Sequence, residues 1–198
     1  EARPFAIDPK YLLSPSDGKI IVYPTLSPKK LLPIKGSLAS IEELFKTNTA
    51  EQSYYDGAAA VIRLAPYDYH RFHFFDNGEA KQTKNINGTY HSVNPVALKN
   101  APTLFTINKR AITEVDTQSF GQVAYIEIGA LNVGSIIQTY TVGSIKRGQE
   151  KGYFQFGGST IVLVFSHDSV QFDDDLLTDS AEGIETHISA GQIIGRSI

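Results

Sequence analysis

The 198-residue sequence contains no cysteine, no methionine and no tryptophan. Without cysteine the chain has neither a disulfide framework nor a thiolate metal site, and it lacks a cysteine nucleophile. This absence leaves the redox compartment open, because a chain without thiols is compatible with any. Since no methionine is present, the sequence does not start at a translation start, and we interpret Glu1 as the first residue of a processed or truncated fragment.

Long apolar runs and a large excess of one charge are also missing. No stretch approaches 18 consecutive apolar residues, so the sequence predicts no membrane-spanning helix, and no signal peptide opens it. Lys and Arg number 18 against 21 Asp and Glu. The resulting net charge of −3 argues against a strongly basic, nucleic-acid-binding protein. At about 150 residues per domain, the length predicts one domain, residues 1–198, with a substantial core.

Short runs rich in β-branched and aromatic residues, bounded by turn residues, dominate the sequence. The clearest of them are 19–23, 60–64, 122–128 and 160–165. Turn signals at 76–78 and 87–88 frame a polar segment expected to form an exposed hairpin or loop. A short repeat, 133–136 and 142–145, is read as two neighbouring strands of a meander. We therefore expect a mainly β (α+β) fold: a single-domain β-sandwich or barrel-like core.

One or two short helices are expected beside the strands. Ser40 and Glu43 fit a capping box, which predicts a helix starting at Ile41. Residues 96–99, after an Asn-Pro pair, are expected to add one short helical turn. The acidic run 173–175 is interpreted as a solvated loop, the usual behaviour of a charge cluster.

Three segments hold polar residues too densely for ordinary strands or turns: 14–18, 63–73 and 148–160. The second contains His70 and His73 among aromatic residues. A separation of three puts two histidines on one face only in a helix, whereas this segment favours extended structure, in which they point to opposite sides. Because no third ligand clusters with them, we predict no metal site.

Ser159 ends the third segment, just before a hydrophobic strand. It lacks the Gly-x-Ser-x-Gly elbow of α/β-hydrolases, and the alternation of strands and helices typical of that fold is absent. The preceding pair Gly157-Gly158 is compatible with a bulge or a phosphate-binding turn, but no helix follows it to complete an anion site.

Several motifs follow one another along the chain. Their ordered combination is specific, although no single one of them would be. The main ones are Ser14-Pro15-Ser16-Asp17-Gly18, Asp68-Tyr69-His70-Arg71-Phe72-His73, Gly129-Ala130-Leu131-Asn132-Val133-Gly134-Ser135 and Gly157-Gly158-Ser159-Thr160. Together they resemble the signatures of the phosphatidylserine decarboxylase family of pyruvoyl-dependent, self-processing enzymes. The resemblance covers nearly the whole chain.

The resemblance implies that the chain cuts itself between Gly158 and Ser159. Ser159 Oγ would attack the carbonyl of Gly158 to form an ester, and β-elimination would release residues 1–158. Hydrolysis of the dehydroalanine left at position 159 would give a pyruvoyl group, the covalent cofactor, at the start of fragment 159–198. By the same resemblance, His73 is the base that activates Ser159, and Asp17 orients His73.

After processing, the resemblance implies a decarboxylase that binds the substrate's amine as a Schiff base on the pyruvoyl group. His70 is the candidate acid that protonates the resulting carbanion. An apolar pocket that includes Tyr69, Phe72 and Phe74 would favour loss of CO2 by desolvating the carboxylate.

The favoured substrate is phosphatidylserine, which would be converted to phosphatidylethanolamine and CO2. The resemblance implies a phospholipid partner at a membrane surface, peripheral association with the cytoplasmic face and a homodimer, although this fragment itself is expected to be soluble. Two alternatives stay open: a relative that decarboxylates a soluble amino acid such as tryptophan, and a family member that never cleaves itself and has no enzymatic activity.

Overall fold

The structure is a computed structural model, and it describes residues 4–26, 32–34, 37–39, 41–45, 53–88, 109–129, 135–155 and 159–198. The helical turn expected at 96–99 lies outside the described residues. The same holds for Gly157 and Gly158 of the predicted cleavage site.

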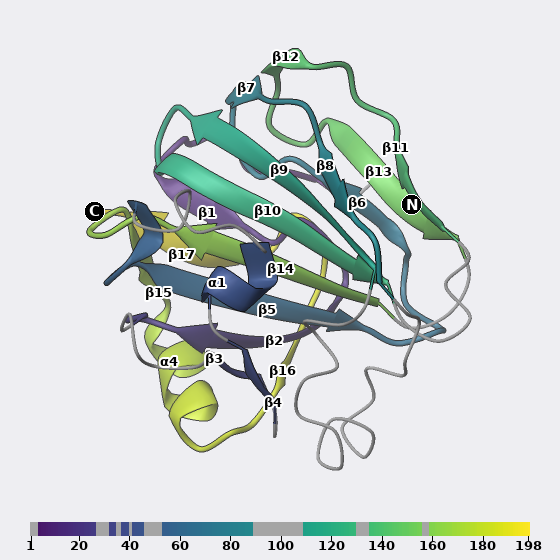
Figure 1. Ribbon diagram of the computed structural model, residues 1–198. Coiled ribbons are helices and arrows are strands. Elements are labelled where there is room, and N and C mark those ends of the chain that lie inside the picture. The colour runs from purple at the N-terminus through teal and green to yellow at the C-terminus, as the bar shows by residue number, and fades with distance from the viewer. Residues whose placement is uncertain are drawn as a thin grey trace.

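Strands make up most of the described chain, as the sequence predicts (Figure 1). The strands are β1 (Tyr11–Leu13), β2 (Gly18–Tyr23), β3 (Leu32–Ile34), β4 (Ser37–Ala39), β5 (Ala58–Leu64), β6 (Arg71–His73), β7 (Gly78–Ala80), β8 (Lys84–Ile86), β9 (Arg110–Thr117), β10 (Gly121–Gly129), β11 (Ser135–Gln138), β12 (Gly143–Ile145), β13 (Glu150–Gln155), β14 (Ser159–Phe165), β15 (Val170–Phe172), β16 (Thr186–Ile188) and β17 (Ile193–Ser197). The helices are α1 (Ile41–Phe45) and α4 (Asp174–Ala181). The expected mainly β fold with one or two short helices is thereby confirmed within the described residues.

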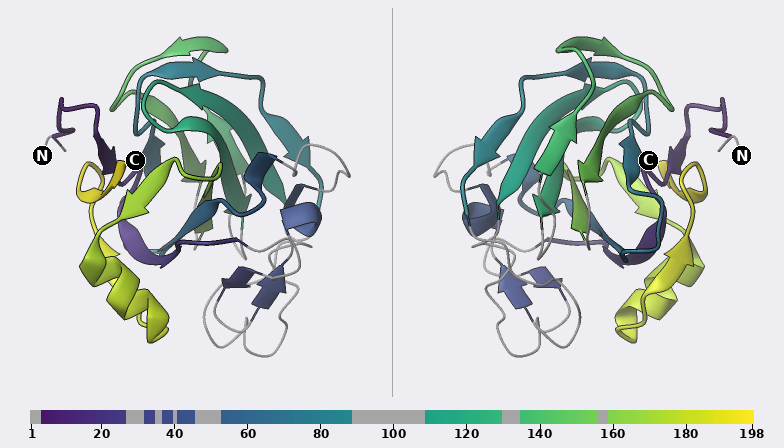
Figure 2. Two further views of the ribbon diagram at one scale, coloured as in Figure 1. Left: turned by 90° about the vertical axis from the view of Figure 1, so that its left-hand side faces the viewer. Right: turned by 90° about the vertical axis from the view of Figure 1, so that its right-hand side faces the viewer.

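Nine of these strands form one antiparallel sheet, which we call the main sheet. Its order is β12-β7-β9-β10-β14-β5-β2-β16, and β8 also pairs with β9. Within the described residues the sheet curves without closing into a barrel (Figure 2). A three-stranded sheet of order β11-β13-β6, here the cover sheet, packs over one face of the main sheet, because Phe72 of β6 contacts Tyr125 of β10.

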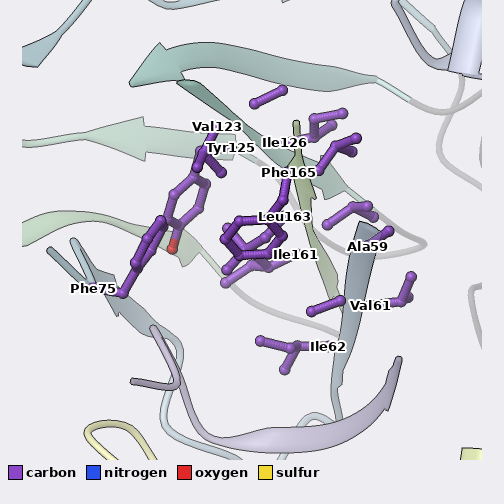
Figure 3. Packing of buried hydrophobic residues seen from close by; sticks show 14 of the residues in the cluster. Ala59, Val61, Ile62, Phe75, Val123, Tyr125, Ile126, Ile161, Leu163 and Phe165 are labelled. Atoms are coloured by element: carbon purple, nitrogen blue, oxygen red, sulfur yellow. The ribbon is translucent and has the colours of Figure 1, made fainter. Parts of the chain in front are cut away.

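The core fills the space enclosed by these strands (Figure 3). All seven residues of β14 are buried, which fits an apolar strand covered on both faces rather than one that alternates. Phe165 of β14 makes ring contacts with Phe75, Phe120 and Phe172, so the strand is packed as well as hydrogen-bonded. The described part of the chain includes no helix long and apolar enough to cross a membrane.

The acidic run 173–175 is not a loop, and that expectation is wrong. Asp174 and Asp175 form the first turn of α4, where carboxylates are favoured by the positive end of the helix dipole. Leu176 is buried, and Ser180 Oγ accepts a hydrogen bond from the backbone N of Val22, so the helix packs against β2. Gly183, with φ +73°, follows the helix as a typical C-terminal signal.

The expectation that the short repeat forms two neighbouring strands of a meander is also wrong. The copies of the short repeat fall on different sheets: β11 pairs with β13, and β12 pairs with β7. Of the hairpin or loop expected at 79–86, the hairpin is excluded, because β7 and β8 both pair with β9 and not with each other. Local sequence similarity and turn residues do not reveal which distant strand a segment joins.

Gly152 of β13 provides a test of how closely the cover sheet is packed. A Cβ there would lie 2.1 Å from the carbonyl oxygen of Ile137 and 2.9 Å from the ring of Phe72. Gly152→Ala should therefore lower the free energy of unfolding by about 3 kcal/mol. Gly183→Ala, which has open space around its Cβ, should cost only about 1 kcal/mol through its positive φ. Urea unfolding of both variants measures these changes, and equal losses in the free energy of unfolding would contradict the close packing at Gly152.

Candidate active site

Ser159 is the first residue of β14 and lies in a row of paired residues that crosses the main sheet. It stands opposite Gly129 of β10 on one side and Leu64 of β5 on the other. Because Lys19 stands opposite Arg63, Gly18 is the next residue on β2 to reach the level of Leu64. In Figure 1 the arrowhead of β5 accordingly points to the end of the sheet where β14 starts. The register therefore brings the Asp17-Gly18 turn and Ser159 to the same edge of the main sheet, the edge formed by the ends of its strands.

Gly18 explains why the turn before β2 ends in glycine. Its φ is +148°, and a Cβ at this position would lie 2.7 Å from the carbonyl oxygen of Arg63. Only glycine therefore lets the turn close tightly onto β5. Asp17 is fixed at this point, since its Oδ1 accepts a hydrogen bond of 2.9 Å from the backbone N of Ala190.

His73 adjoins the same turn. Its backbone N donates to the carbonyl of Pro15 (2.9 Å), and its ring packs between Phe5 (centroids 5.4 Å apart) and Tyr69 (6.1 Å, nearly parallel). Nδ1 lies 3.1 Å from the carbonyl oxygen of Gly148. A carbonyl oxygen only accepts, so Nδ1 carries the proton and Nε2 is the basic nitrogen of the neutral ring.

His70 is held against the end of β5. Its Nε2 lies 2.9 Å from the carbonyl oxygen of Ala65, the residue after Leu64, so by the same reasoning Nε2 donates. Asp68 Oδ2 accepts a hydrogen bond of 2.7 Å from the backbone N of Ala65, which closes the turn that folds His70 back. Nδ1 of His70 is buried and has no hydrogen-bond partner among the described residues. The two histidines are thus anchored to different carbonyls.

The hydroxyl of Ser159 is completely buried, and it finds no hydrogen-bond partner in the described part of the chain. A buried polar group without a partner costs about 1–3 kcal/mol, a cost that reactive groups often carry. The direct contacts of the predicted triad, Asp17–His73–Ser159, stay a prediction. The structure supplies a shared edge for the three segments and a tautomer of His73 suited to a base.

The aromatic residues of the expected apolar pocket divide between two places. Phe72 and Phe74 are fully buried between the sheets, where both contact Tyr125. Tyr69 instead stacks on His73. A pocket of about 310 Å³ lies elsewhere, at the opposite end of β5 and β14, and is lined by residues such as Ala58, Ser166 and Ile198.

One buried pair was not predicted from the sequence. Lys151 of β13 and Glu127 of β10 are both fully buried, with Lys151 Nζ 2.5 Å from Glu127 Oε1. Glu127 interrupts the otherwise apolar run 123–128, and that interruption is the signal that could have identified it.

Comparison with known proteins gives one consistent result. The model of the family described as phosphatidylserine decarboxylase matches residues 1–196. Among curated proteins, the chain is 48% identical over 198 residues to a phosphatidylserine decarboxylase proenzyme of Ruminiclostridium cellulolyticum, covering 100% of this chain and 66% of that protein.

Two further relatives carry the same name, phosphatidylserine decarboxylase proenzyme. The protein of Clostridium botulinum is 44% identical over 196 residues, which are 98% of this chain and 66% of the relative. The protein of Clostridium novyi is 42% identical over 199 residues, with 100% and 68% covered. The chain thus spans 66% to 68% of the length of these relatives. On this evidence the chain belongs to the phosphatidylserine decarboxylase family.

Proposed function

We propose that the chain is a proenzyme that cleaves itself before Ser159 and then acts as a phosphatidylserine decarboxylase. The observation that carries the proposal is the buried Ser159 hydroxyl, which has no partner among the described residues and directly follows Gly157-Gly158. It shares the edge of the main sheet with the Asp17 turn and with the segment that holds His73.

The first step of the proposed self-cleavage needs a base for Ser159. Nε2 of His73 suits this role, because Gly148 fixes the ring proton on Nδ1. Nε2 takes the hydroxyl proton while Oγ attacks the carbonyl carbon of Gly158. The peptide C–N bond then breaks as Nε2 returns the proton to the nitrogen, which leaves an ester and an amine at residue 159. Asp17 is assigned, by family resemblance, to orient His73.

The second step releases the N-terminal piece. Removal of the Cα proton of residue 159 expels the ester carboxylate as the new C-terminus at Gly158. Dehydroalanine remains at position 159, and water converts it to a pyruvoyl group with release of ammonia. The predicted products are fragments 1–158 and 159–198.

The fold can hold these fragments together without the peptide bond. β14 of the C-terminal fragment pairs along its whole length with β10 and β5 of the N-terminal fragment. β16 pairs with β2, and β17 pairs with β1. We therefore expect the two pieces to separate only when the protein is unfolded.

Position 159 suits a pyruvoyl group because it is buried, and its hydroxyl has no partner within the described residues that processing would displace. Such a group supplies an electrophilic carbonyl for the substrate's amine and an electron sink when CO2 leaves. His70 is the proposed acid: Ala65 holds the proton on Nε2, and Nδ1 remains for a second proton that can be delivered to the substrate carbon.

The names of the relatives favour phosphatidylserine as the substrate. The proposed partners are therefore a phospholipid at a membrane surface and a second copy of the chain, with peripheral association at the cytoplasmic face. The alternatives, a soluble amino acid such as tryptophan or a chain that never cleaves itself, are separated from this proposal by the following experiments.

Self-cleavage is tested by electrophoresis and mass spectrometry of the purified chain. The wild type should give two pieces, the smaller being 198 − 158 = 40 residues of the 198-residue, 21.7-kDa chain, roughly 4.4 kDa. Its N-terminus should be blocked and should react with hydroxylamine. Ser159→Ala should remain full length, because it lacks the attacking oxygen.

Thr160→Val is the matched control for Ser159→Ala. It removes the next hydroxyl along the strand, which is also buried without a described partner but lies on the other face of the sheet. This variant should still be cleaved. A wild-type chain that stays in one piece under all conditions would refute the proposed self-cleavage.

The division of labour between the histidines is tested by comparing His70→Ala with His73→Ala. His70→Ala should be cleaved normally but should release CO2 from phosphatidylserine vesicles about 10²- to 10³-fold more slowly, whereas His73→Ala should fail to cleave. His167→Ala, a highly exposed histidine paired with Asp168, should behave like the wild type.

The same assay of CO2 release, run with free tryptophan and free serine beside the vesicles, identifies the substrate class. Faster release from a soluble amino acid would favour the alternative decarboxylase. Loss of cleavage in His70→Ala would mean that the roles of the two histidines are assigned wrongly.

A further inference from the structure

Lys151 and Glu127 form a charged contact between the two sheets. Lys151 belongs to the cover sheet and Glu127 to the main sheet, and neither side chain has any exposed surface. Lys151 Nζ also donates to Thr113 Oγ1 (2.9 Å) and to Gln138 Oε1 (2.8 Å). All three hydrogens of an ammonium group are therefore used.

The directions of the surrounding hydrogen bonds require that Lys151 be the donor. Tyr140 Oη donates to the carbonyl of Lys81 (2.7 Å), so it must accept from Thr83 Oγ1 (2.8 Å). Thr83 then accepts from Thr113 (2.8 Å), and Thr113 in turn accepts from Lys151. The chain runs in one direction, away from the ammonium group.

Glu127 is the matching acceptor. Its Oε1 receives Lys151, and its Oε2 receives Gln138 Nε2 at 3.2 Å. Both carboxylate oxygens therefore accept a hydrogen bond, and the network holds the pair as an ammonium and a carboxylate.

Stability alone does not account for this arrangement. Burial lowers the pKa of Lys151 and raises the pKa of Glu127, so desolvation opposes both charges. Four aromatic rings lie 4.9–5.9 Å from Nζ and lessen the penalty: Tyr125, Tyr140, Phe72 and Phe74. Even so, a buried ion pair generally stabilises a fold no better than apolar residues of the same volume.

The position of the pair relates it to the predicted cleavage site. Lys151 lies on β13, which ends at Gln155, four residues before Ser159. Four Cα–Cα steps can span at most about 14 Å, so the placement of β13 restricts the approach of the chain to Ser159. Glu127 lies two residues from Gly129, the cross-strand partner of Ser159, and on the same face of the main sheet.

We propose that Lys151 and Glu127 are positioning residues for self-cleavage: their contact holds β13 against β10 and so sets how the chain enters Ser159. The inference rests on the proposed self-cleavage. It assigns the pair no contact with the reacting atoms. Its effect is on the rate at which the proenzyme is cut, not on whether the chain folds.

The test measures the rate of cleavage and the thermal stability of the same variants. In Lys151→Met/Glu127→Leu, apolar side chains of similar volume replace the pair, so the melting temperature should be retained or raised. Cleavage of the freshly translated 198-residue chain, followed by pulse-labelling in vitro, should nevertheless be at least tenfold slower. A role limited to stability would leave this rate unchanged.

The matched control is Lys81→Met/Glu114→Leu, which removes an exposed ion pair of 3.0 Å remote from Ser159 and should cleave at the wild-type rate. If the double variant of the buried pair does not fold, Glu127→Gln decides the question, because it keeps the shape and an acceptor for Lys151 but removes the carboxylate charge. Wild-type cleavage rates in the folded variants would overturn the proposal. A wild-type chain that does not cleave would instead refute the proposed function.

Discussion

The ladder of hydrogen bonds on both sides of β14 is the constraint on which the rest of the structure depends. Residues 159–165 pair with 58–64 on one side and with 123–129 on the other. This double pairing fixes Ser159 at the edge of the sheet and buries its hydroxyl. It also means that the C-terminal 40 residues are held mainly by contacts with distant strands, so a cut at the start of β14 leaves the ladder in place.

Three cations whose side chains are mostly buried lie around this framework, and each finds a different set of acceptors. Arg110 donates to the carbonyls of Glu43 and Leu44 at the end of α1, and burial lowers its pKa to about 10. Lys151 is matched by Glu127. Arg147 donates to Asp76 and to four backbone carbonyls of the N-terminal segment, those of Ala6, Asp8, Pro9 and Tyr11.

The contacts of Arg147 matter for His73. They tie down the segment that carries Phe5, whose ring packs on the imidazole, while the next residue along, Gly148, holds Nδ1. Residues 147–148 of one loop therefore hold Phe5 against the ring of His73 and also fix the tautomer of that ring. The N-terminal segment, which is far from the cleavage motif in sequence, is thus held beside the proposed base by contacts that no motif records.

Such contacts explain why the sequence predicted some features well and others not at all. The buried strand that begins at Ser159, the mainly β fold and the helix at 41–45 follow from local residue types, which act within a few positions of one another. The partner strands of 133–136 and 142–145 depend on pairings between distant parts of the chain, and for that reason the two copies lie in different sheets.

The helix α4 was not predicted, because the acidic residues of its first turn were interpreted as a solvated charge cluster rather than as the start of a helix. The Lys151–Glu127 pair joins residues 24 positions apart on different sheets, and only the fold brings them together. The buried pair could not be predicted because its free energy depends on the fold. Burying a charged side chain costs much free energy without a partner and less with one, and only the folded chain brings that partner beside it.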